Sequence, residues 1–360
     1  MKKLLVLAVV CIMSTPLVRA ETSNVNVYGT INTSLESVKA GASETGKDYT
    51  SRLRMISNST NFGVKGSEDL TSDLKGVFQI ELDVRIPEGG LQGPLRNSMV
   101  GLQGNWGTLF IGKWDTPFKS ANYFMEPFYG SGVGYLASIA DIISGATALN
   151  GESFNLRKEN TLNYWSPKFV GLSLNLMYSP KGTGATANDN LMSGSLNYSE
   201  GPINAAFAYE THKEYVAIGQ RDTGIKVAAG YKLFDMTSLN VAWDQISQKP
   251  ANEIVTKRTA LLFSLIHKID DFAVRAGYGI AGKIKTDNAE VANTGAKLLT
   301  FGGSYTLSKR TDLYAVFSKI SNEEAAEYNY VIGAVGPGSP ATLSAGFDPQ
   351  SIGIGVRHTF

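Results

Sequence analysis

The stretch LKGVFQIELDVR, residues Leu74–Arg85, alternates between two kinds of side chain. One parity is apolar and the other is charged or amide-bearing, with Val77 as the apolar exception on the polar side. Successive side chains of a strand point to opposite faces, so the stretch predicts a strand with one apolar face and one charged face. Such a strand fits a soluble β-protein with its apolar face on a core, and also a membrane protein with that face on lipid.

The first twenty residues have the pattern of a secretory signal peptide. Lys2 and Lys3 precede an apolar run over residues 4–13, and Val18-Arg19-Ala20 supplies small residues at the two positions that signal peptidase reads. The run is too short for a membrane anchor. We therefore expect a signal peptide over residues 1–20 and a mature chain over 21–360. The one cysteine, Cys11, lies in the signal, so neither a disulfide nor a thiolate metal site is expected.

The mature chain is nearly neutral. The whole chain has 33 Lys and Arg against 32 Asp and Glu, and the signal removes three basic residues, which leaves a net charge of about −2. This balance gives no indication of a nucleic-acid partner. After residue 20, no apolar run approaches the ~18 residues of a membrane helix.

Alternation of the same kind recurs along the whole chain. Examples are residues 25–34, 172–178, 203–209, 239–244, 274–278 and 351–357. Short turn signals such as Ser166-Pro167 and Asp270-Asp271 separate some segments, whereas longer polar gaps separate others: Ala40–Thr50, Lys181–Asn190 and Gly282–Gly295. The 38 glycines disfavour long helices. The chain is therefore predicted to be all-β, built of hairpins with short turns at one end and long loops at the other.

Composition distinguishes between the two kinds of β-protein that such hairpins could form. A soluble β-protein would carry Lys and Glu on its polar faces, but these faces are rich in Asn, Ser, Thr and Gly, and only 18% of residues are charged. Aromatic residues such as Trp165, Tyr178 and Phe360 stand at segment ends, as in the girdles of membrane barrels. About 340 residues at roughly 20 per strand give about 16 strands, an even number as in such barrels. An antiparallel transmembrane β-barrel is favoured over a secreted soluble protein.

Several stretches resemble the general (non-specific) porins of Gram-negative bacteria, in their β-proteobacterial branch. They follow the family's order along the chain: VYGTI from Val27, FGVKGSEDL (Phe62–Leu70), LKGVFQIE (Leu74–Glu81), RNSMVGLQGNWGTLFIGK (Arg96–Lys113), RKENTLNYWSPKFVGLSL (Arg157–Leu174), LSKRTDLYA (Leu307–Ala315) and GVRHTF (Gly355–Phe360). The resemblance implies a 16-stranded barrel with an aqueous pore and a third extracellular loop folded into the lumen. It implies a homotrimer spanning the outer membrane many times, in contact with lipid and lipopolysaccharide, and an assembly signal at Phe360.

The residues themselves also indicate such a loop. Between Lys113 and Arg157 lie about 43 residues without alternation, too many for an ordinary connection. They carry Asp115, Glu126 and Asp141, together with apolar residues that would pack the segment down. We expect a constriction loop over about 114–156, with a loose surface loop as the alternative.

The polar parity of the strands supplies candidate pore residues. A lipid-facing Arg or Lys at mid-depth would cost about 2–4 kcal/mol, so these charged faces are expected to line the lumen. The candidates found by parity are Lys65, Lys75, Glu81, Asp83, Arg85 and Arg157. Opposite them we expect the carboxylates of Asp115, Glu126 and Asp141, which would create a field across the constriction. For each single wall residue, the alternative is a side chain that is merely solvated.

Two weaker candidates and two departures from the family complete the set. Lys113 shares the parity of the apolar Leu109, so it needs a bulge or must lie beyond the strand end, and Arg96 is placed near the pore only by the resemblance. Asn61 and Asn163 stand where relatives often carry an arginine on the barrel wall. Because cations and anions nearly balance, we expect weak ion selectivity of either sign.

These features together predict a general diffusion porin that passes small hydrophilic solutes and ions. A substrate-specific channel of the same fold is the main alternative, and a structural barrel with a closed lumen is a third. An enzyme is not expected, because none of His212, His267 and His358 has a nucleophile and an acid partner at recognisable spacing. The sequence shows no metal-ligand cluster and no phosphate loop, so we expect no metal and no cofactor.

Overall fold

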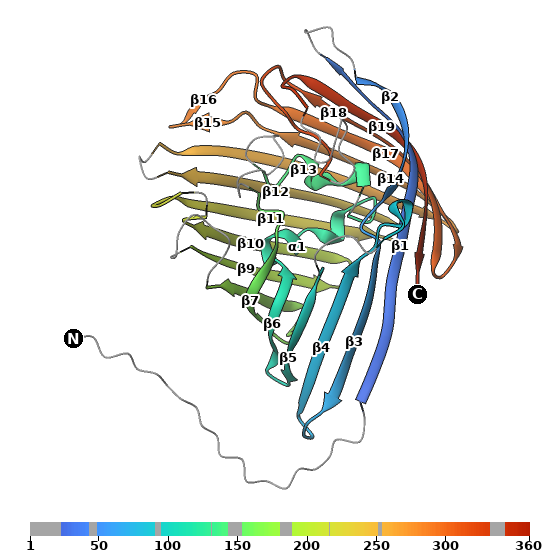
Figure 1. Cartoon of the computed structure of the whole chain (residues 1–360), viewed down its shortest axis with the longest axis vertical. Coiled ribbons are helices and arrows are strands. Elements are labelled where there is room, and N and C mark those ends of the chain that lie inside the picture. Colours follow the sequence, from blue (N-terminus) through green and yellow to red (C-terminus); the bar gives the residue numbers. More distant parts are fainter. Residues whose placement is uncertain are drawn as a thin grey trace, which may run out of the picture.

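The computed structural model describes residues 23–42, 49–90, 95–130, 132–142, 153–180, 189–215, 217–250, 254–331 and 343–360. The predicted signal peptide and residues 181–188 of one expected long loop lie outside them. The described residues form one antiparallel sheet that closes on itself (Figure 1). Closure is made by β1 (Ser23–Ala42), which pairs on one side with β19 (Phe347–Thr359) and on the other with β2 (Tyr49–Ser57) and β3 (Asn61–Asp69).

The described part of the chain gives this barrel sixteen wall strands. Of its nineteen strands, β2 and β3 are two halves of one wall strand, because both pair with β1. A small hairpin, β15 (Lys285–Thr286) and β16 (Ala289–Glu290), lies in the connection between β14 and β17. The other wall strands are β4 (Leu74–Asp83), β5 (Ser98–Gly104), β6 (Gly107–Asp115), β7 (Arg157–Trp165), β8 (Leu172–Ser179), β9 (Asn190–Glu200), β10 (Ile203–Lys213), β11 (Arg221–Leu233), β12 (Thr237–Lys249), β13 (Thr256–Ile269), β14 (Phe272–Ala281), β17 (Ala296–Ser308) and β18 (Thr311–Asn322). The predicted sixteen-stranded antiparallel barrel is confirmed.

The connections are short at one end of the barrel and long at the other. Gly201 and Pro202 alone join β9 to β10, and Asp270 and Asp271 alone join β13 to β14. The connections from β6 to β7, from β14 to β17 and from β18 to β19 are all longer and lie at the opposite end. β1 begins and β19 ends at the short-turn end, where Thr30 pairs with Thr359. This is the asymmetry that the turn signals in the sequence predict.

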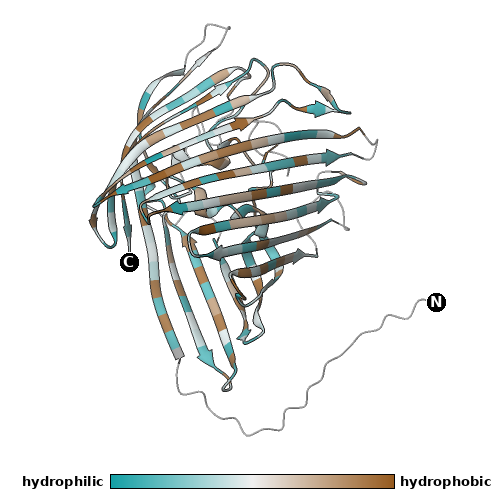
Figure 2. Cartoon of the chain, turned by 180° about the vertical axis from the view of Figure 1, so that it is seen from behind, coloured by the Kyte–Doolittle hydropathy of each residue, from teal (hydrophilic) through white to brown (hydrophobic). Residues whose placement is uncertain are grey.

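The apolar face of the barrel is its outer face. Ile80 of β4 is 51% exposed, whereas the next residue, Glu81, is 9% exposed. Exposed apolar side chains recur on the wall strands, among them Val27, Leu53, Val100, Ile111, Leu162, Leu174, Phe207, Val227, Phe263, Phe301 and Ile354. Figure 2 shows apolar and polar residues alternating along the strands. A membrane barrel has this inverted pattern because its outer face meets lipid, so the charged face of Leu74–Arg85 looks inward as far as the strand extends.

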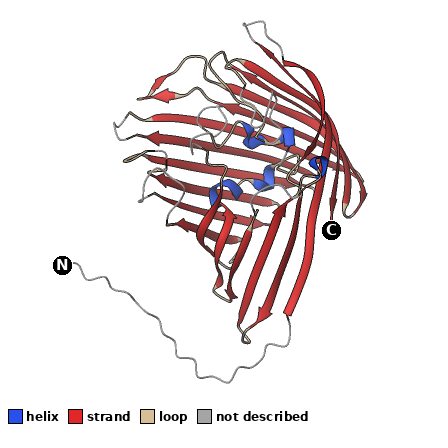
Figure 3. Ribbon diagram, in the orientation of Figure 1, coloured by secondary structure: helices blue, strands red, loops and turns tan. Residues whose placement is uncertain are grey.

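The described helices are all short. α1 (Pro117–Ser120) and the 3₁₀ turns η2 (Tyr123–Met125), η3 (Gly132–Gly134) and η4 (Leu136–Ser138) lie in the β6–β7 connection, and η1 (Ile86–Glu88) follows β4. Figure 3 shows them within the outline of the barrel. Thr116 caps α1, because its Oγ1 accepts a hydrogen bond from the Lys119 backbone N–H at 3.2 Å. None of the described helices is long and apolar enough to cross a membrane.

A bulge in β6 sets where the β6–β7 connection begins. The register between β6 and β7 shifts between Gly112 and Trp114. Gly112 has φ 154°, and a Cβ at this residue would overlap the carbonyl oxygen of Ser98, so the position requires glycine. Of the two explanations that the parity of Lys113 allows, the structure shows the bulge, and β6 bends where it leads into the connection.

Candidate functional site

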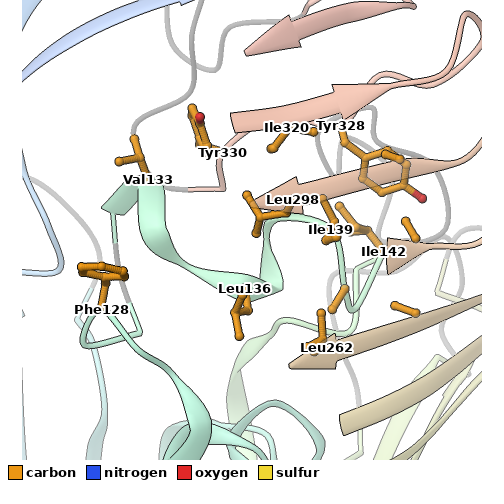
Figure 4. Packing of buried hydrophobic residues seen from close by; sticks show 14 of the residues in the cluster. Phe128, Val133, Leu136, Ile139, Ile142, Leu262, Leu298, Ile320, Tyr328 and Tyr330 are labelled. Atoms are coloured by element: carbon orange, nitrogen blue, oxygen red, sulfur yellow. The ribbon is translucent and has the colours of Figure 1, made fainter. Parts of the chain in front are cut away.

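The β6–β7 connection packs against the strands on the far side of the barrel. Its apolar residues Phe128, Val133, Leu136, Ile139 and Ile142 are each at most 7% exposed. They form one cluster with residues of β11 to β14, β17 and β18 (Figure 4), namely Ala228, Ala242, Ala260, Leu262, Ala281, Leu298, Val316 and Ile320. The alanines are small enough to let the connection approach the wall. Burial of each large side chain contributes roughly 1.5–3 kcal/mol, so the cluster holds the connection in place.

Polar side chains of the same strands bind the backbone of the connection. Lys226 of β11 donates to the Phe118 carbonyl oxygen at 3.1 Å and pairs with Asp141 at 2.8 Å. Arg258 of β13 donates to the Ile139 carbonyl oxygen at 2.9 Å. Arg275 of β14 donates to the Pro127 carbonyl oxygen at 2.7 Å. An irregular segment leaves its carbonyl groups without ladder partners, and these bonds satisfy some of them.

Between the connection and the opposite wall lies a cavity of about 530 Å³. The wall side belongs to β19, β1, the β2–β3 strand and β7, together with Arg96 just before β5. The cavity is lined by Thr30, Asn32, Asn58, Ser59, Asn61, Arg96, Asp115, Lys119, Tyr123, Glu126, Tyr129, Gly130, Tyr135, Asn155, Arg157, Val331 and Arg357.

Strand register fixes the order of the groups along the wall of the cavity. Asn32 of β1 pairs with Arg357 of β19, and Thr30 of β1 pairs with Asn61 of β3. Asn61 pairs in turn with Asp83 of β4, and the Arg96 backbone N–H donates to the carbonyl oxygen of Glu81, two residues before Asp83, at 2.8 Å. An uncharged polar patch therefore lies between an arginine on β19 and an arginine beside β4.

The cavity lining has more cations than anions. Its cations are Arg96, Lys119, Arg157 and Arg357, and its carboxyl groups are those of Asp115 and Glu126. Asp115 is ion-paired with Lys119 at 3.0 Å and with Arg157 at 3.2 Å. Arg96 is paired behind the lining with Glu81 at 2.7 Å, and Arg357 with Asp312 at 3.8 Å. The carboxylates of Glu81 and Asp312, which lie outside the lining, thus partly compensate its excess of positive charge.

Glu126 contributes less negative charge than an ordinary glutamate. It is 8% exposed and accepts a hydrogen bond from the Leu136 backbone N–H at 3.1 Å. Burial raises the pKa of Glu126 to about 8, with a smaller contribution from the Asp141 carboxylate in the same direction. At neutral pH the Glu126 carboxyl group is therefore mostly uncharged.

Four of the charged pore candidates from the sequence meet at this cavity, namely Arg96, Asp115, Glu126 and Arg157, and Asn61 lines it too. Glu81 and Asp83 lie behind it as partners of Arg96, at 2.7 Å and 3.7 Å. The structure therefore brings only some of the predicted pore residues together at this cavity.

The other candidates lie away from the cavity. Lys65 stacks over the Tyr28 ring at 4.9 Å, and Lys75 pairs with Asp69 at 3.2 Å beside the β3–β4 turn. Lys113 lies 3.9 Å from Glu159.

Arg85 and Asp141 depart furthest from their expected places. The sequence extends the alternation of β4 to Arg85, but the strand ends at Asp83, and Arg85 precedes η1 and pairs with Glu88 at 3.7 Å. Asp141 does not line the cavity; it is 1% exposed and paired with Lys226 of β11.

Some residues that line the cavity were not among the candidates predicted from the sequence. Arg357 could have been found from the sequence, since it lies on the parity opposite the apolar residues Ile352, Ile354 and Val356 of the last strand. Tyr129 has two arginine guanidinium groups over its ring, those of Arg357 and Arg275, each at 4.8 Å. Only the fold brings these two arginines to the same ring.

Phe360 completes the closure of the barrel at the short-turn end. Its backbone exchanges two hydrogen bonds of 3.1 Å with Gly29 of β1. Its ring lies 6.5 Å from the ring of Phe62, between centroids, on the outer face. A role as an assembly signal stays a prediction.

Among known protein families, the one described as Gram-negative porin matches residues 6–325. The chain belongs to the Gram-negative porin family. Among its relatives, outer membrane porin protein 32 of Delftia acidovorans is 25% identical over 356 residues, with 94% of each chain covered. The major outer membrane protein P.IB of Neisseria meningitidis serogroup B is 23% identical over 353 residues, with 95% of this chain and 96% of the relative covered. The resemblance to the β-proteobacterial branch is confirmed.

A solved structure, described as an anion-selective porin from Comamonas acidovorans, has the same fold. Its TM-score is 0.78 at 22% identity, and the match covers 94% of this chain and 100% of that chain. The protein is thus a porin of the Gram-negative outer membrane, a multi-pass channel rather than an enzyme. Among the described residues, no group of three or more His, Cys, Asp or Glu side chains is placed to hold a metal ion.

Proposed function

We propose that the charged cavity is the constriction of a general diffusion channel for small hydrophilic solutes and ions. The β6–β7 connection would be its inward-folded third extracellular loop, with bounds of about 114–156, of which residues 131 and 143–152 lie outside the described part. The observation that carries the proposal is the cavity itself: it lies between the connection and the opposite wall, and charged and amide side chains line it. A 16-stranded barrel is wide enough to leave an aqueous channel around such a loop.

We also propose a weak preference for anions. The four cations of the lining exceed its two carboxyl groups, one of which, that of Glu126, is mostly neutral at pH 7. Glu81 and Asp312 behind Arg96 and Arg357 limit the effect. Charges within a Debye length of about 8 Å act on a passing ion at physiological salt, so the preference should fade in high salt.

Arg157→Glu is expected to shift the reversal potential, measured in planar bilayers across a KCl gradient, toward cation selectivity. A change of two unit charges at about 8 Å in water corresponds to about 1 kcal/mol for each ion, or roughly a fivefold lower permeability to the anion. Arg157→Gln should give about half of that free energy. Lys75→Glu is the matched control, because Lys75 lies at the β3–β4 turn. Equal shifts for Arg157→Glu and Lys75→Glu would contradict the assignment of the constriction.

The anion preference is expected to fall as pH rises through about 8, where the Glu126 carboxyl group becomes charged. One added negative charge should lower the permeability to the anion roughly twofold. Burial also lowers the pKa of Lys119, whose loss of charge would act in the same direction. Reversal potentials of wild type, Glu126→Gln and Lys119→Gln, recorded across this pH range, separate the two groups. A step near pH 8 that persists in Glu126→Gln would assign it to another group.

We further propose that this porin forms a homotrimer whose outer surface contacts membrane lipid and lipopolysaccharide. The exposed apolar residues of the wall strands require lipid or protein around them. OmpT of Vibrio cholerae, which shares the fold at a TM-score of 0.66 and 16% identity, is described in a trimer form. Cross-linking in native membranes tests the oligomeric state, and a monomer band alone would overturn it.

A further inference from the structure

We propose that the constriction binds polyhydroxylated carboxylates, the class of aldonic and uronic acids, more tightly than it binds simple anions. This inference rests on the proposed function, because it places the site at the constriction. A solute of this class has a carboxylate at one end and a row of hydroxyl groups along the rest. The cavity offers groups that are complementary to both parts, in the same order.

The hydroxyl-binding part would be the uncharged patch on β1 and the β2–β3 strand. Its members include Ser59 and Asn61, and an amide side chain both donates and accepts hydrogen bonds. Asn61 uses one amide N–H to donate to the Ser59 carbonyl oxygen at 3.1 Å, which leaves its other N–H and its Oδ1 for a solute. Asn58 supports the patch from behind, because it is 4% exposed and donates to the hydroxyl groups of Ser34 at 2.8 Å and Tyr314 at 3.0 Å.

The carboxylate-binding part would be the arginines and lysine next to this patch. Arg157 uses its Nε to donate to Asn97 Oδ1 at 2.7 Å and its second terminal nitrogen to donate to Asp115 at 3.4 Å. A guanidinium group has five N–H donors, so Arg157 keeps donors beyond these two bonds. Lys119 and Arg96 line the same cavity. Carboxylates bind such groups through short, charge-assisted hydrogen bonds.

The two parts are neighbours because of the strand register. Asn61 pairs with Asp83 of β4, and Asp83 lies 3.7 Å from the Arg96 guanidinium group. A carboxylate held by Arg96 and Arg157 would therefore direct its hydroxyl chain along Asn61 and Ser59. On the loop side, the 40% exposed Tyr123 presents an aromatic ring to the cavity, a surface for the C–H groups of such a chain. The cavity volume of about 530 Å³ lies within the range of small-molecule sites, about 300–1,000 Å³.

Hydroxyl recognition would set this solute class apart from simple anions. Chloride or a short alkyl carboxylate is attracted by the cations but leaves the Asn61 amide and the Ser59 hydroxyl unused. A neutral polyol can bind the Asn61 amide and the Ser59 hydroxyl but gains nothing from the cations. Two or three additional hydrogen bonds, each contributing modestly in a wet site, predict roughly tenfold tighter binding of the solute that satisfies both.

Block of the chloride current by added solutes tests the proposal, with the full porin in planar bilayers. The probes are gluconate, propionate (charge without hydroxyls) and sorbitol (hydroxyls without charge). We expect the half-blocking concentration of gluconate to be about tenfold lower than that of either control solute. Asn61→Leu, which keeps the side-chain shape, should raise the value for gluconate roughly fivefold and leave that for propionate unchanged. Asn61→Gln should retain most of the block.

Asn26→Leu is the matched control variant. Asn26 of β1 pairs with Lys65 of β3, so it lies on the same face of the sheet as Asn61, but it does not line the cavity. Gluconate should block this variant at the same half-blocking concentration as wild type. The proposal is overturned if gluconate blocks no better than propionate, or if Asn61→Leu and Asn26→Leu give equal values while the chloride current is normal. A folded porin without any chloride current would instead overturn the proposed function.

Discussion

Deletion of residues 128–136 from the β6–β7 connection is expected to raise the single-channel conductance by about twofold or more, because a 16-stranded barrel leaves an aqueous channel when nothing fills it. The deleted stretch includes Tyr129, Gly130 and Tyr135, which line the cavity, and Phe128, Val133 and Leu136, which pack the connection against the far wall. Without these contacts the rest of the connection loses its hold on the wall. The measurement is conductance of refolded porin in planar bilayers at high salt, where surface charge contributes little.

The control for this deletion is a loop that lies away from the cavity. The β15–β16 hairpin, residues 285–290, pairs with the end of β13, and its Lys285–Glu290 ion pair is half-exposed. Removing it should leave the conductance unchanged. If the shortened connection also leaves the conductance unchanged, in protein with the β-content of wild type, the connection does not restrict the pore.

The barrel could be predicted from the sequence because its signal is local and repeated. Each wall strand shows the period of two, and the composition of the polar faces decides which face is outside. Ile80 and Glu81 illustrate the result, since the apolar residue is exposed and the acid is buried. The number of strands followed from length alone, even though one wall strand is divided. Ser59, with φ 57°, lies at that division between β2 and β3, and nothing in the local pattern marks it.

The cavity was harder to predict, because its members come together through long-range contacts. Alternation assigns a face but not a height along the strand, so Lys75 and Glu81 looked equivalent although only Glu81 lies behind the cavity. The alternation carried the strand two residues too far, to Arg85, although Pro87 follows closely. Proline cannot donate to a sheet ladder, so the strand had to end near it. Asp141 could not be placed from the sequence, since its partner Lys226 lies on β11, far along the chain.

Lys226→Met is expected to lower the free energy of unfolding by about 3–5 kcal/mol, the usual cost of breaking a buried ion pair by removing one partner. Lys226 and Asp141 are each 1% exposed, and the ammonium group also donates to the Phe118 carbonyl oxygen and to Asn122 Oδ1. The variant leaves the Asp141 carboxylate buried without its cation. Because the pair joins the connection to β11, the loss should appear both as a lower urea midpoint in detergent micelles and as noisier open-channel current.

The double variant Lys226→Met/Asp141→Leu distinguishes the cost of an unpaired charge from the loss of a needed link. Replacing both partners of a buried pair by apolar residues is often neutral or stabilising, so the double variant should recover most of the lost free energy. Lys75→Met is the exposed control, and its pair with Asp69 should contribute less than about 1 kcal/mol. If the current stays noisy in the double variant while stability returns, the pair also fixes the position of the connection. If Lys226→Met matches Lys75→Met in both measurements, the connection is held by its apolar cluster and by the arginines of β13 and β14, and Lys226 has no part in keeping the constriction narrow.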